Sequence, residues 1–280
     1  MISVPLQLLI ALALDALIGD PHGWPHPVRL IAWLALNLEK VTRASIKDER
    51  IAGILTALLV MLATGSLTYC IVRIGGLFHP LLGDIISILI IYAGIAAHDL
   101  AKHARSVQDA LVSKNLDIGR KRVGMICGRD TDTLNEIGVT KATIESVAEN
   151  TVDGVTAPLF YGMLVGPVGV MVYKAISTLD STFGYKNDRY WRFGWASARM
   201  DDLAAFVPSR LTSFLVPIAA WINNMRSLDS FMVLKRDRLR HASPNSGHTE
   251  AAFAGALGLR LGGPGYYQGA LQDKPFIGDP

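Results

Sequence analysis

The chain alternates long apolar runs with polar stretches. Residues 51–72 carry no charge over twenty-two positions, and a membrane-spanning helix needs about 20 apolar residues. We therefore expect this run to cross a bilayer. Residues 155–173 form a second uncharged run, of nineteen positions. Its glycines and two prolines favour a kinked or re-entrant path over a straight helix.

Three further apolar runs each contain ionisable residues: 4–18 with Asp15, 77–97 with His79 and Asp84, and 203–225 with Arg210. Strand signals are sparse, so the pattern predicts an all-α polytopic membrane protein with four to five membrane segments. We expect 1–280 to form a single membrane-embedded domain. Asp15 is a functional candidate, because an acid inside an apolar run is costly.

Polar stretches at 19–50, 98–154, 174–202 and 226–250 connect the apolar runs. The first two are rich in Lys and Arg, which places them in the cytoplasm by the positive-inside rule. We expect helical cytoplasmic loops there, and an active site on the cytoplasmic side of the cell membrane.

The composition supports a membrane protein. Half of the residues are hydrophobic, and the mean hydropathy is +0.32. The net charge is +3, but the basic residues lie in loops between apolar runs, so we expect no nucleic-acid binding. The two cysteines, Cys70 and Cys127, give neither a disulfide framework nor a metal-binding spacing.

An acidic pattern stands directly before the run 155–173. Glu145, Glu149 and Asp153 follow one another at intervals of four residues, which on a helix places the three carboxylates on one face. Unpaired carboxylates at a membrane edge repel each other, and a divalent cation would relieve that repulsion. The alternative is a solvated helix face. The neighbouring Asn150 favours a hard-cation site at the rim of the bilayer.

Polar residues also follow the run 155–173. Lys174 could extend to the membrane interface or contact an anionic substrate. Arg199, Asp201 and Asp202 stand at the entry to the next apolar run, where adjacent aspartates do not share a helix face. Arg210 could bind phosphate or form a salt bridge with one of these aspartates.

Turn-forming residues precede a helix rich in small residues at 243–263, SPNSGHTEAAFAGALGLRLGG. Backbone amides at the start of such a helix could hold phosphate near Asn245, and the alternative is a flexible loop on closely packed helices. No Walker A pattern and no GxGxxG is present. The small residues would also permit a homo-oligomer.

Four motifs together resemble the CobD/CbiB family of cobalamin-biosynthesis membrane proteins, the adenosylcobinamide-phosphate synthases. They are LDALIGDPHGWPHPVRLIAWL, ESVAENTVDGVTAPLFY, KAISTLDSTFGYKNDRYWRFGWASARMDDLAAFVPSRL and HASPNSGHTEAAFAGALGLRLGGPGYY. They occur in order over nearly the whole chain. Family members usually continue past the C-terminal GDP into one more apolar helix.

The resemblance implies an acid–amine ligase that forms a C–N bond. Such an enzyme joins adenosylcobyric acid to aminopropanol or its O-phosphate, with ATP as co-substrate and a divalent metal, Mg²⁺. Phosphoryl transfer from ATP would activate the carboxylate. On this basis we expect the metal ligands to be Glu145, Glu149 and Asp153, with Asp201 or Asp202 as a second set. The expected catalytic residues are Glu145, Asn150, Lys174 and Asp180, and the expected substrate and phosphate contacts are Asp20, Arg29, Tyr185, Arg199, Arg210 and Asn245.

Two other functions compete with this one. An Mg²⁺-dependent prenyl- or alcohol-phosphate transferase also places acidic clusters at helix ends, but ENTVD only partly matches its N-D-x-x-D motif. A transporter or non-catalytic corrinoid-binding membrane protein would tend to show internal repeats, and none is visible here.

Overall fold

The computed structural model describes residues 2–20, 26–267 and 269–279. Most of them are helical, which confirms the all-α class. The described chain divides into two compact units. The first unit comprises Met1–His98 and Asp153–Ala205, and the second comprises Asp99–Val152 and Phe206–Pro280.

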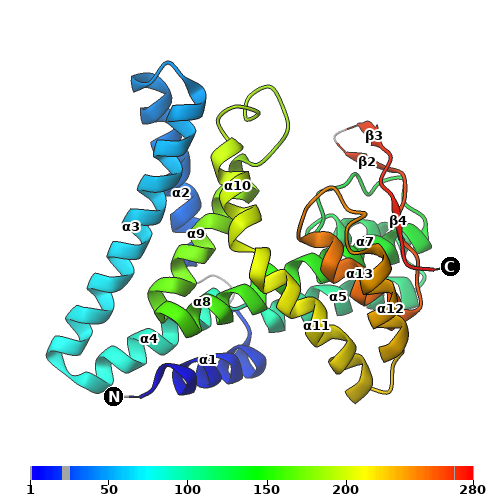
Figure 1. The fold of residues 1–280 in the computed structure, drawn as a ribbon, viewed down its shortest axis with the longest axis horizontal. Coiled ribbons are helices and arrows are strands. Elements are labelled where there is room, and N and C mark those ends of the chain that lie inside the picture. Colours follow the sequence, from blue (N-terminus) through cyan, green and yellow to red (C-terminus); the bar gives the residue numbers. More distant parts are fainter. Residues whose placement is uncertain (1, 21–25, 268, 280) are drawn as a thin grey trace. The chain divides into compact units, whose positions relative to one another are not determined.

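The first unit is built around one long helix, α3, which packs against α2, α4, α9 and α10 (Figure 1). A main core cluster includes Val60 of α3, Leu179 and Phe183 of α9, and Phe193. The elements of this unit are α1 (Val4–Ile18), α2 (Pro27–Ser45), α3 (Glu49–Phe78), α4 (Pro80–Gly94), the π-helical turn η1 (Val152–Thr156), α8 (Ala157–Val165), α9 (Pro167–Phe183) and α10 (Trp195–Ala204).

The side chains of α3 are distributed as in a membrane helix. Its buried positions are mostly small or hydroxyl residues: Ala52, Gly53, Thr56, Ala57, Thr64, Thr68 and Gly75. Large apolar residues such as Leu62 and Leu67 are exposed. Small residues allow close helix packing, while large apolar ones suit lipid. A Cβ on Gly53 would lie 1.9 Å from the carbonyl oxygen of Phe193, so this approach requires glycine.

Helix length supports fewer membrane spans than the sequence predicts. In the described chain, Glu49–Phe78 and Pro80–Val112 are long and apolar enough to cross a membrane. A third span is obtained only if Trp195–Ala204 and Phe206–Ile222 are counted as one broken span. Helix α1, with 15 residues, is shorter than the roughly 20 that a span needs. The structure therefore supports two or three spans instead of four or five.

The uncharged run 155–173 is divided, as its prolines and glycines predict. Helix α8 ends at Gly166, whose φ of 66° is unfavourable for other residues, and Pro167 begins α9. The two helices pack against each other. The run therefore forms a helical hairpin and not one spanning helix.

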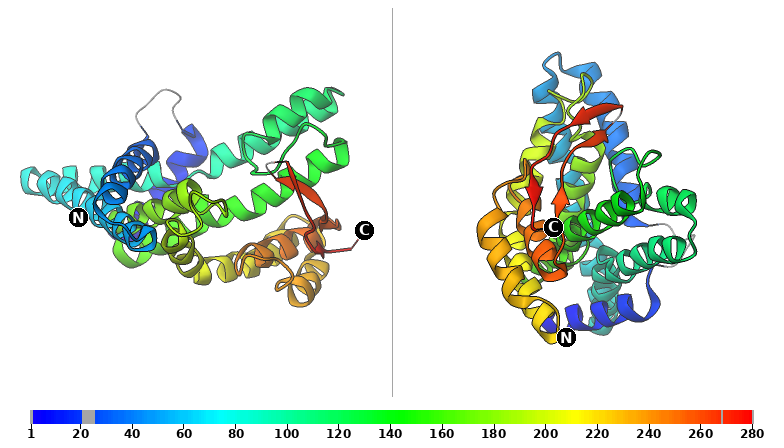
Figure 2. Two further views of the ribbon diagram at one scale, coloured as in Figure 1. Left: turned by 90° about the horizontal axis from the view of Figure 1, so that it is seen from above. Right: turned by 90° about the vertical axis from the view of Figure 1, so that its right-hand side faces the viewer.

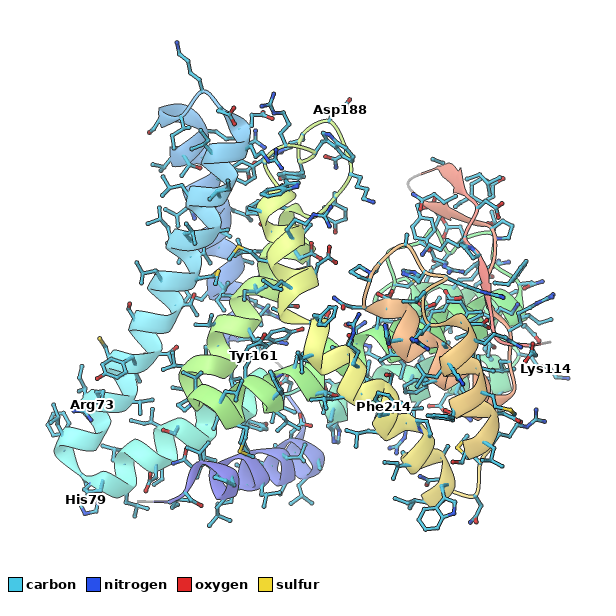
Figure 3. The ribbon with its side chains drawn as sticks, viewed as in Figure 1. Arg73, His79, Lys114, Tyr161, Asp188 and Phe214 are labelled. Carbon is cyan, nitrogen blue, oxygen red and sulfur yellow. The ribbon has the colours of Figure 1, made fainter. Side chains whose placement is uncertain are left out.

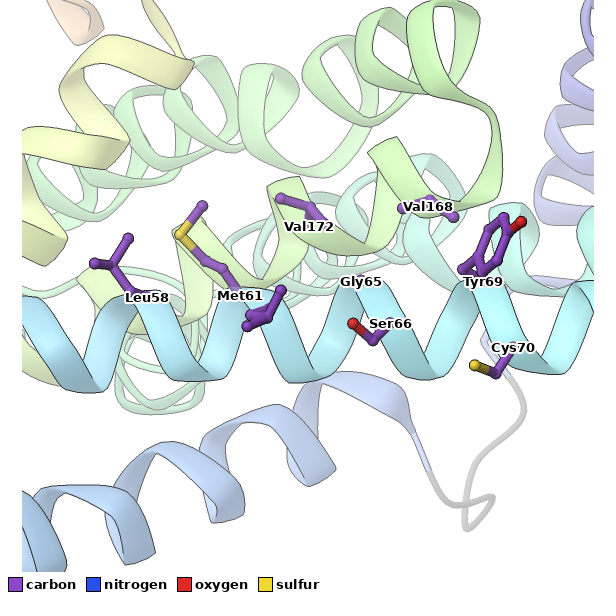
Figure 4. A pocket seen from close by; sticks show the side chains of 9 residues that line it. Leu58, Met61, Gly65, Ser66, Tyr69, Cys70, Val168 and Val172 are labelled. Carbon is purple, nitrogen blue, oxygen red and sulfur yellow. The ribbon is translucent and has the colours of Figure 1, made fainter.

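An apolar groove of about 630 Å³ lies between α3 and α9 (Figure 4). Its lining includes Leu58, Leu62 and Tyr69 of α3, and Val168 and Val172 of α9. The lining of this groove includes no charged side chain.

Two acidic residues inside apolar runs are buried, and each accepts hydrogen bonds from neighbouring donors. Asp15 is fully buried, and its Oδ2 accepts from the backbone N–H of His98 at 3.0 Å. Asp84 accepts from the backbone N–H of Ile2 at 2.8 Å and from Gln7 Nε2 at 3.1 Å. Both acids therefore join segments of the first unit that are distant in sequence.

The second unit has the small-residue helix α13 at its centre. It contains α5 (Ala97–Val112), α6 (Leu116–Val123), α7 (Glu136–Thr151), α11 (Phe206–Ile222), α12 (Ser227–Asp237) and α13 (Ser246–Leu257). Helix α13 packs against α7, α11 and α12. Its alanines and glycines permit this, because a larger side chain would separate the helices.

Four short strands follow α13 and form two antiparallel pairs (Figure 2). β1 (Leu261–Gly262) pairs with β4 (Phe276–Ile277), and β2 (Gly265–Tyr267) pairs with β3 (Ala270–Gln272). β1 contacts α7 and β4 contacts α13. This C-terminal segment thereby brings its own polar residues to the carboxylates of α7.

Candidate functional site

The predicted acidic face is interrupted at its last member. Helix α7 ends at Thr151, and Asp153 lies in the π-helical turn η1. A π turn adds a residue to the helical repeat, so the interval of four no longer keeps Asp153 in line with Glu145 and Glu149. The three carboxylates have separate environments.

Glu145 is held by two donors. It forms a buried salt bridge with Arg129, and its Oε1 accepts from the backbone N–H of Gly262 at 2.7 Å. These bonds attach the loop before α7 and strand β1 to the helix. Glu145 was predicted as a catalytic residue and a metal ligand, and the structure gives it a clear structural task.

Glu149 belongs to the one group of three potential metal-binding side chains found in the described residues. Its partners are His241, which follows α12, and Glu250 of α13, and one ligand atom of each lies within 4.8 Å of the others. Glu250 is buried, with 3% of its surface exposed. The group therefore combines two carboxylates and an imidazole from segments about 100 residues apart in sequence.

Burial governs the protonation of this group. It raises the pKa of Glu149 and the pKa of Glu250, and the two carboxyls also form a hydrogen bond with each other. Lys274 opposes both shifts through its positive charge. Because two close carboxylates repel each other, the pair holds a proton between them or binds a cation.

The hydrogen bonds of His241 indicate which ring nitrogen carries the proton. Nδ1 accepts from the backbone N–H of Ser243 at 2.9 Å, and Nε2 lies 3.6 Å from Glu250 Oε1. Burial lowers the pKa of His241, so the ring is neutral at pH 7. A neutral ring that accepts at Nδ1 carries its hydrogen on Nε2. His241 therefore directs an N–H toward Glu250 and offers no lone pair to a metal there.

Arg210 and Asn245, both predicted phosphate contacts, lie together in the second unit. Arg210 Nη1 donates to Asn245 Oδ1 at 3.1 Å, and Asn245 precedes α13 as its N-cap residue. The described acceptors of Arg210 are all uncharged.

Asp153, Tyr173 and Lys174 form a polar group in the first unit. The Tyr173 hydroxyl donates to Asp153 Oδ1 at 2.6 Å, and Lys174 Nζ donates to the Asp153 carbonyl oxygen at 3.4 Å. Burial lowers the pKa of Lys174, while Asp153 and Asp20 oppose that shift. The Tyr161 ring, labelled in Figure 3, stacks on Tyr173 at 5.3 Å.

The remaining acids of the first unit differ in their surroundings. Burial, reinforced by the charges of Asp153 and Asp202, raises the pKa of Asp180 to about 6. Asp202 forms a salt bridge with Arg199 at 3.3 Å. Within the described residues, Asp201 Oδ1 is buried without a hydrogen-bond partner. Asp201 and Asp202 therefore point in different directions, as expected for adjacent helix positions.

Other predicted site residues lie at the surface or pair locally. Arg29 and Tyr185 are exposed. Asn150 is exposed and donates to the Ser146 carbonyl oxygen at 2.8 Å. Asp20 lies 3.5 Å from His26 Nε2. The intervening residues 21–25 of the N-terminal motif are outside the described residues.

Two residues that act at the Glu149 group were not predicted from the sequence: its member Glu250, and Lys274, whose charge acts on both carboxyls. Glu250 was the isolated acid of an otherwise small and apolar helix, which is a signal that could have been used. Lys274 lies in a tail without periodic structure, and only the strand pairing brings it near α7. No sequence interval connects either residue to Glu149.

Comparisons with known proteins agree with one another. A family model described as "CobD/Cbib protein" matches residues 8–280. A Leptospira interrogans protein named "Cobalamin biosynthesis protein CobD" is 46% identical over 277 residues, which are 99% of this chain and 88% of the relative. A Pelobacter propionicus protein with the same name is 46% identical over 276 residues, covering 99% and 85%.

A Salmonella arizonae protein named "Cobalamin biosynthesis protein CbiB" is 41% identical over 273 residues, covering 96% of this chain and 86% of the relative. No solved structure matches the chain. Identity at this level over nearly the full length extends well beyond the motifs that suggested the resemblance. The chain belongs to the CobD/CbiB family of cobalamin biosynthesis proteins.

Proposed function

We propose that this protein joins adenosylcobyric acid to aminopropanol, or to its O-phosphate, in an ATP-dependent reaction that forms an amide. Family membership supports the pathway, and one geometric observation supports the chemistry. The carboxyls of Glu149 and Glu250 converge from helices α7 and α13. Such a pair is suited to a divalent cation that accompanies nucleotide phosphates.

The donor set fits Mg²⁺, the metal that the family implies. Mg²⁺ is usually bound by one or two carboxylates together with waters and substrate phosphates. Glu149 and Glu250 supply two carboxylates, and the N–H of His241 orients one of them. When bound, Mg²⁺ would neutralise charge on the phosphate oxygens of ATP. Glu145, Asp153, Asp201 and Asp202 remain predicted ligands for which this cluster offers no support.

The reaction needs ATP because a carboxylate does not react with an amine at neutral pH. The carboxylate oxygen would take the γ-phosphoryl group, releasing ADP and forming an acyl phosphate. The amine nitrogen would then attack the acyl carbon and phosphate would leave, so the products are the amide, ADP and phosphate. The attacking ammonium must also lose protons to a base.

Two residues of the first unit suit the needs of the amine and carboxylate substrates. Asp180 has a pKa near 6, which is favourable for a base that works near neutral pH. Lys174 is a partly buried ammonium beside Asp153 that could orient an anionic group. We retain the predicted substrate contacts Asp20, Arg29, Tyr185 and Arg199, and the predicted catalytic Asn150, as parts of this proposal.

The apolar helices and the basic loops together favour a location in the cell membrane. Apolar helices fit a membrane protein, and the basic loops favour a multi-pass arrangement in the cell membrane with the active site on the cytoplasmic side. We expect the corrinoid, the amine and ATP all to arrive from that side.

The test is product formation by the purified protein in detergent. Adenosylcobyric acid, ATP, Mg²⁺ and either amine should yield a corrinoid with one new amide, detected by mass spectrometry. Glu250→Gln should abolish product, whereas Glu136→Gln in the first turn of α7 should not. Failure of folded wild-type protein to form product with either amine would reject the ligase. Turnover of a lipid phosphate would then support the transferase, and corrinoid binding alone a carrier.

A further inference from the structure

Two arginines lie near the start of helix α13, and neither forms a salt bridge with a carboxylate of the described residues. Arg210 of α11 donates to four neutral oxygens nearby: Phe206 O at 2.7 Å, Asn245 Oδ1 at 3.1 Å, Ser209 Oγ at 3.2 Å and Pro244 O at 3.4 Å. Among the described residues none of its acceptors carries a charge. These hydrogen bonds therefore fix the position of the Arg210 guanidinium but do not neutralise its charge.

A second arginine, Arg238, lies near Arg210. Arg238 follows α12 and lies close enough to Arg210 for the two guanidinium groups to repel each other. Its neighbours Arg236 and Arg240 both form salt bridges with the buried Asp237. Within the described residues, the Arg238 side chain donates to the Lys235 carbonyl oxygen at 2.8 Å and forms no salt bridge. Arg238 thus differs from its neighbours in lacking a carboxylate.

His248 supplies the third and most specific observation. Only 6% of its surface is exposed, and within the described residues its Nε2 is buried without a hydrogen-bond partner. Burial and the nearby charges of Arg210 and Arg238 lower the pKa of His248 to about 4, so the ring is neutral. A buried nitrogen without a partner is costly, and here it stands beside two unneutralised cations.

The first turn of α13 adds a partial positive charge, although two of its backbone N–H groups already have acceptors: that of Ser246 donates to Ser243 Oγ at 3.3 Å, and that of His248 donates to the Asn245 carbonyl oxygen at 3.1 Å. Asn245 is the N-cap residue, yet its side chain makes no capping hydrogen bond and instead accepts from Ser209 and Arg210. The N-terminus of a helix carries a partial positive charge, which favours a nearby anion. Gly247 allows this arrangement, because a Cβ there would lie 2.6 Å from the Arg238 carbonyl oxygen.

We infer that Arg210, Arg238, His248 and the first turn of α13 form a binding site for a phosphate group of a substrate. Two guanidinium groups match a phosphate dianion in charge, and their planar N–H donors bind its oxygens in pairs. The unpartnered Nε2 of His248 and the positive end of helix α13 complete the surroundings of the anion. The site contains no carboxylate among the described residues, so it selects an anion and not a metal.

The phosphate has two possible sources, and this part of the inference rests on the proposed function. Aminopropanol O-phosphate carries a terminal dianion, and ATP carries a chain of phosphates. If the site binds the amine, it explains how the enzyme would prefer the phosphorylated form. If it binds the nucleotide, it holds phosphates of ATP in addition to the Mg²⁺ proposed at the Glu149–Glu250 pair.

Binding can be measured without turnover on the full chain in detergent. Calorimetric titrations would use inorganic phosphate, aminopropanol O-phosphate, aminopropanol and ATP in turn. Arg238→Gln should weaken binding of the phosphate-bearing ligand by about 10- to 100-fold, since a charge-assisted hydrogen bond contributes about 1.5–3 kcal/mol. Arg240→Gln is the matched control, because that arginine pairs with Asp237, and it should change binding less than twofold.

Each outcome decides the question. Weakening with aminopropanol O-phosphate but not ATP assigns the site to the amine, and the reverse assigns it to the nucleotide. Unchanged binding of both ligands by folded Arg238→Gln and Arg210→Lys variants would overturn the site, even if the enzyme makes product. Conversely, Arg238-dependent phosphate binding by a protein that makes no amide would retain the site and reject the ligase. Circular dichroism would verify folding of each variant.

Discussion

Tyr173 and Asp153 join the two ends of the apolar hairpin. The Tyr173 hydroxyl donates to Asp153 Oδ1 at 2.6 Å, although 20 residues separate them in sequence. The chain between them travels out along α8, reverses at Gly166 and returns along α9. The polar residues that precede the hairpin and those that follow it, including Lys174, therefore lie at the same end of it.

Loss of this hydrogen bond should destabilise the first unit. In Tyr173→Phe the Asp153 carboxylate loses a buried donor, which typically costs about 1–3 kcal/mol. Thermal unfolding in detergent should show a lower midpoint than the wild type. Tyr69→Phe, at an exposed position of α3, provides the control and should unfold at the wild-type temperature. Equal midpoints for both variants would mean that the bond contributes nothing.

Glu145 and Glu149 should respond differently to the same substitution. Glu145→Gln leaves Arg129 as a buried cation without its partner, and breaking such a pair costs about 3–5 kcal/mol. Glu149→Gln removes a proposed metal ligand and should mainly weaken Mg²⁺ binding. The comparison requires denaturant unfolding and Mg²⁺ titration of both variants. A stable Glu145→Gln protein without Mg²⁺ affinity would restore Glu145 to the metal site.

The Glu149–Glu250 pair should make metal binding and stability depend on pH in opposite ways. Both carboxyls have a folded pKa above the ordinary value of 4.5. The folded protein thus holds a proton that the unfolded chain releases. Without metal, this contribution to stability is complete below pH 4.5 and is lost as the pH rises through the raised pKa. Mg²⁺ competes with the same proton, so its affinity should increase over that interval.

Thermal unfolding at several pH values, with and without Mg²⁺, measures both effects. The stabilisation by Mg²⁺ should grow with pH in the wild type and be absent in Glu250→Gln. A stabilisation that does not vary with pH would show that the metal binds elsewhere.

His241 should remain outside the metal's coordination shell. Its Nδ1 accepts from Ser243, so its Nε2 carries a hydrogen, which faces Glu250 Oε1 at 3.6 Å. With Mn²⁺ in place of Mg²⁺, pulsed electron paramagnetic resonance should detect no directly bound imidazole nitrogen. His241→Gln preserves an N–H donor and should retain Mn²⁺ affinity better than His241→Ala. A strong nitrogen coupling that disappears in His241→Gln would identify the histidine as a ligand.

Asp180 should determine how kcat/KM decreases at low pH. Its pKa of about 6 means that the carboxylate is deprotonated above that pH and can act as a base. The kcat/KM should therefore fall as the pH decreases below about 6. Asp180→Asn should remove this decrease and lower the rate by about 10²- to 10⁴-fold. Asp188→Asn, at an exposed loop position, serves as control, and persistence of the decrease in Asp180→Asn would assign it to another group.

Several features of the fold could be predicted because they depend on local sequence. The uncharged run 51–72 predicts a long apolar helix, and α3 contains it. The prolines and glycines of 155–173 predict a break, and the chain reverses at Gly166. Helix formation and helix breaking are decided mainly by neighbouring residues, so one chain segment carries enough information.

Pairings between distant segments depended on the tertiary structure. Glu149 meets Glu250 because small side chains let α13 pack closely against α7, and Glu145 meets Arg129 and β1 instead of a shared cation. A regular helix would have kept Asp153 on the face of Glu145 and Glu149, but the π turn η1 changed its direction. The sequence by itself determined the family, the helices and their breaks. Only the packing of those helices decided which carboxylates meet, because such contacts are set by long-range burial and not by spacing along the chain.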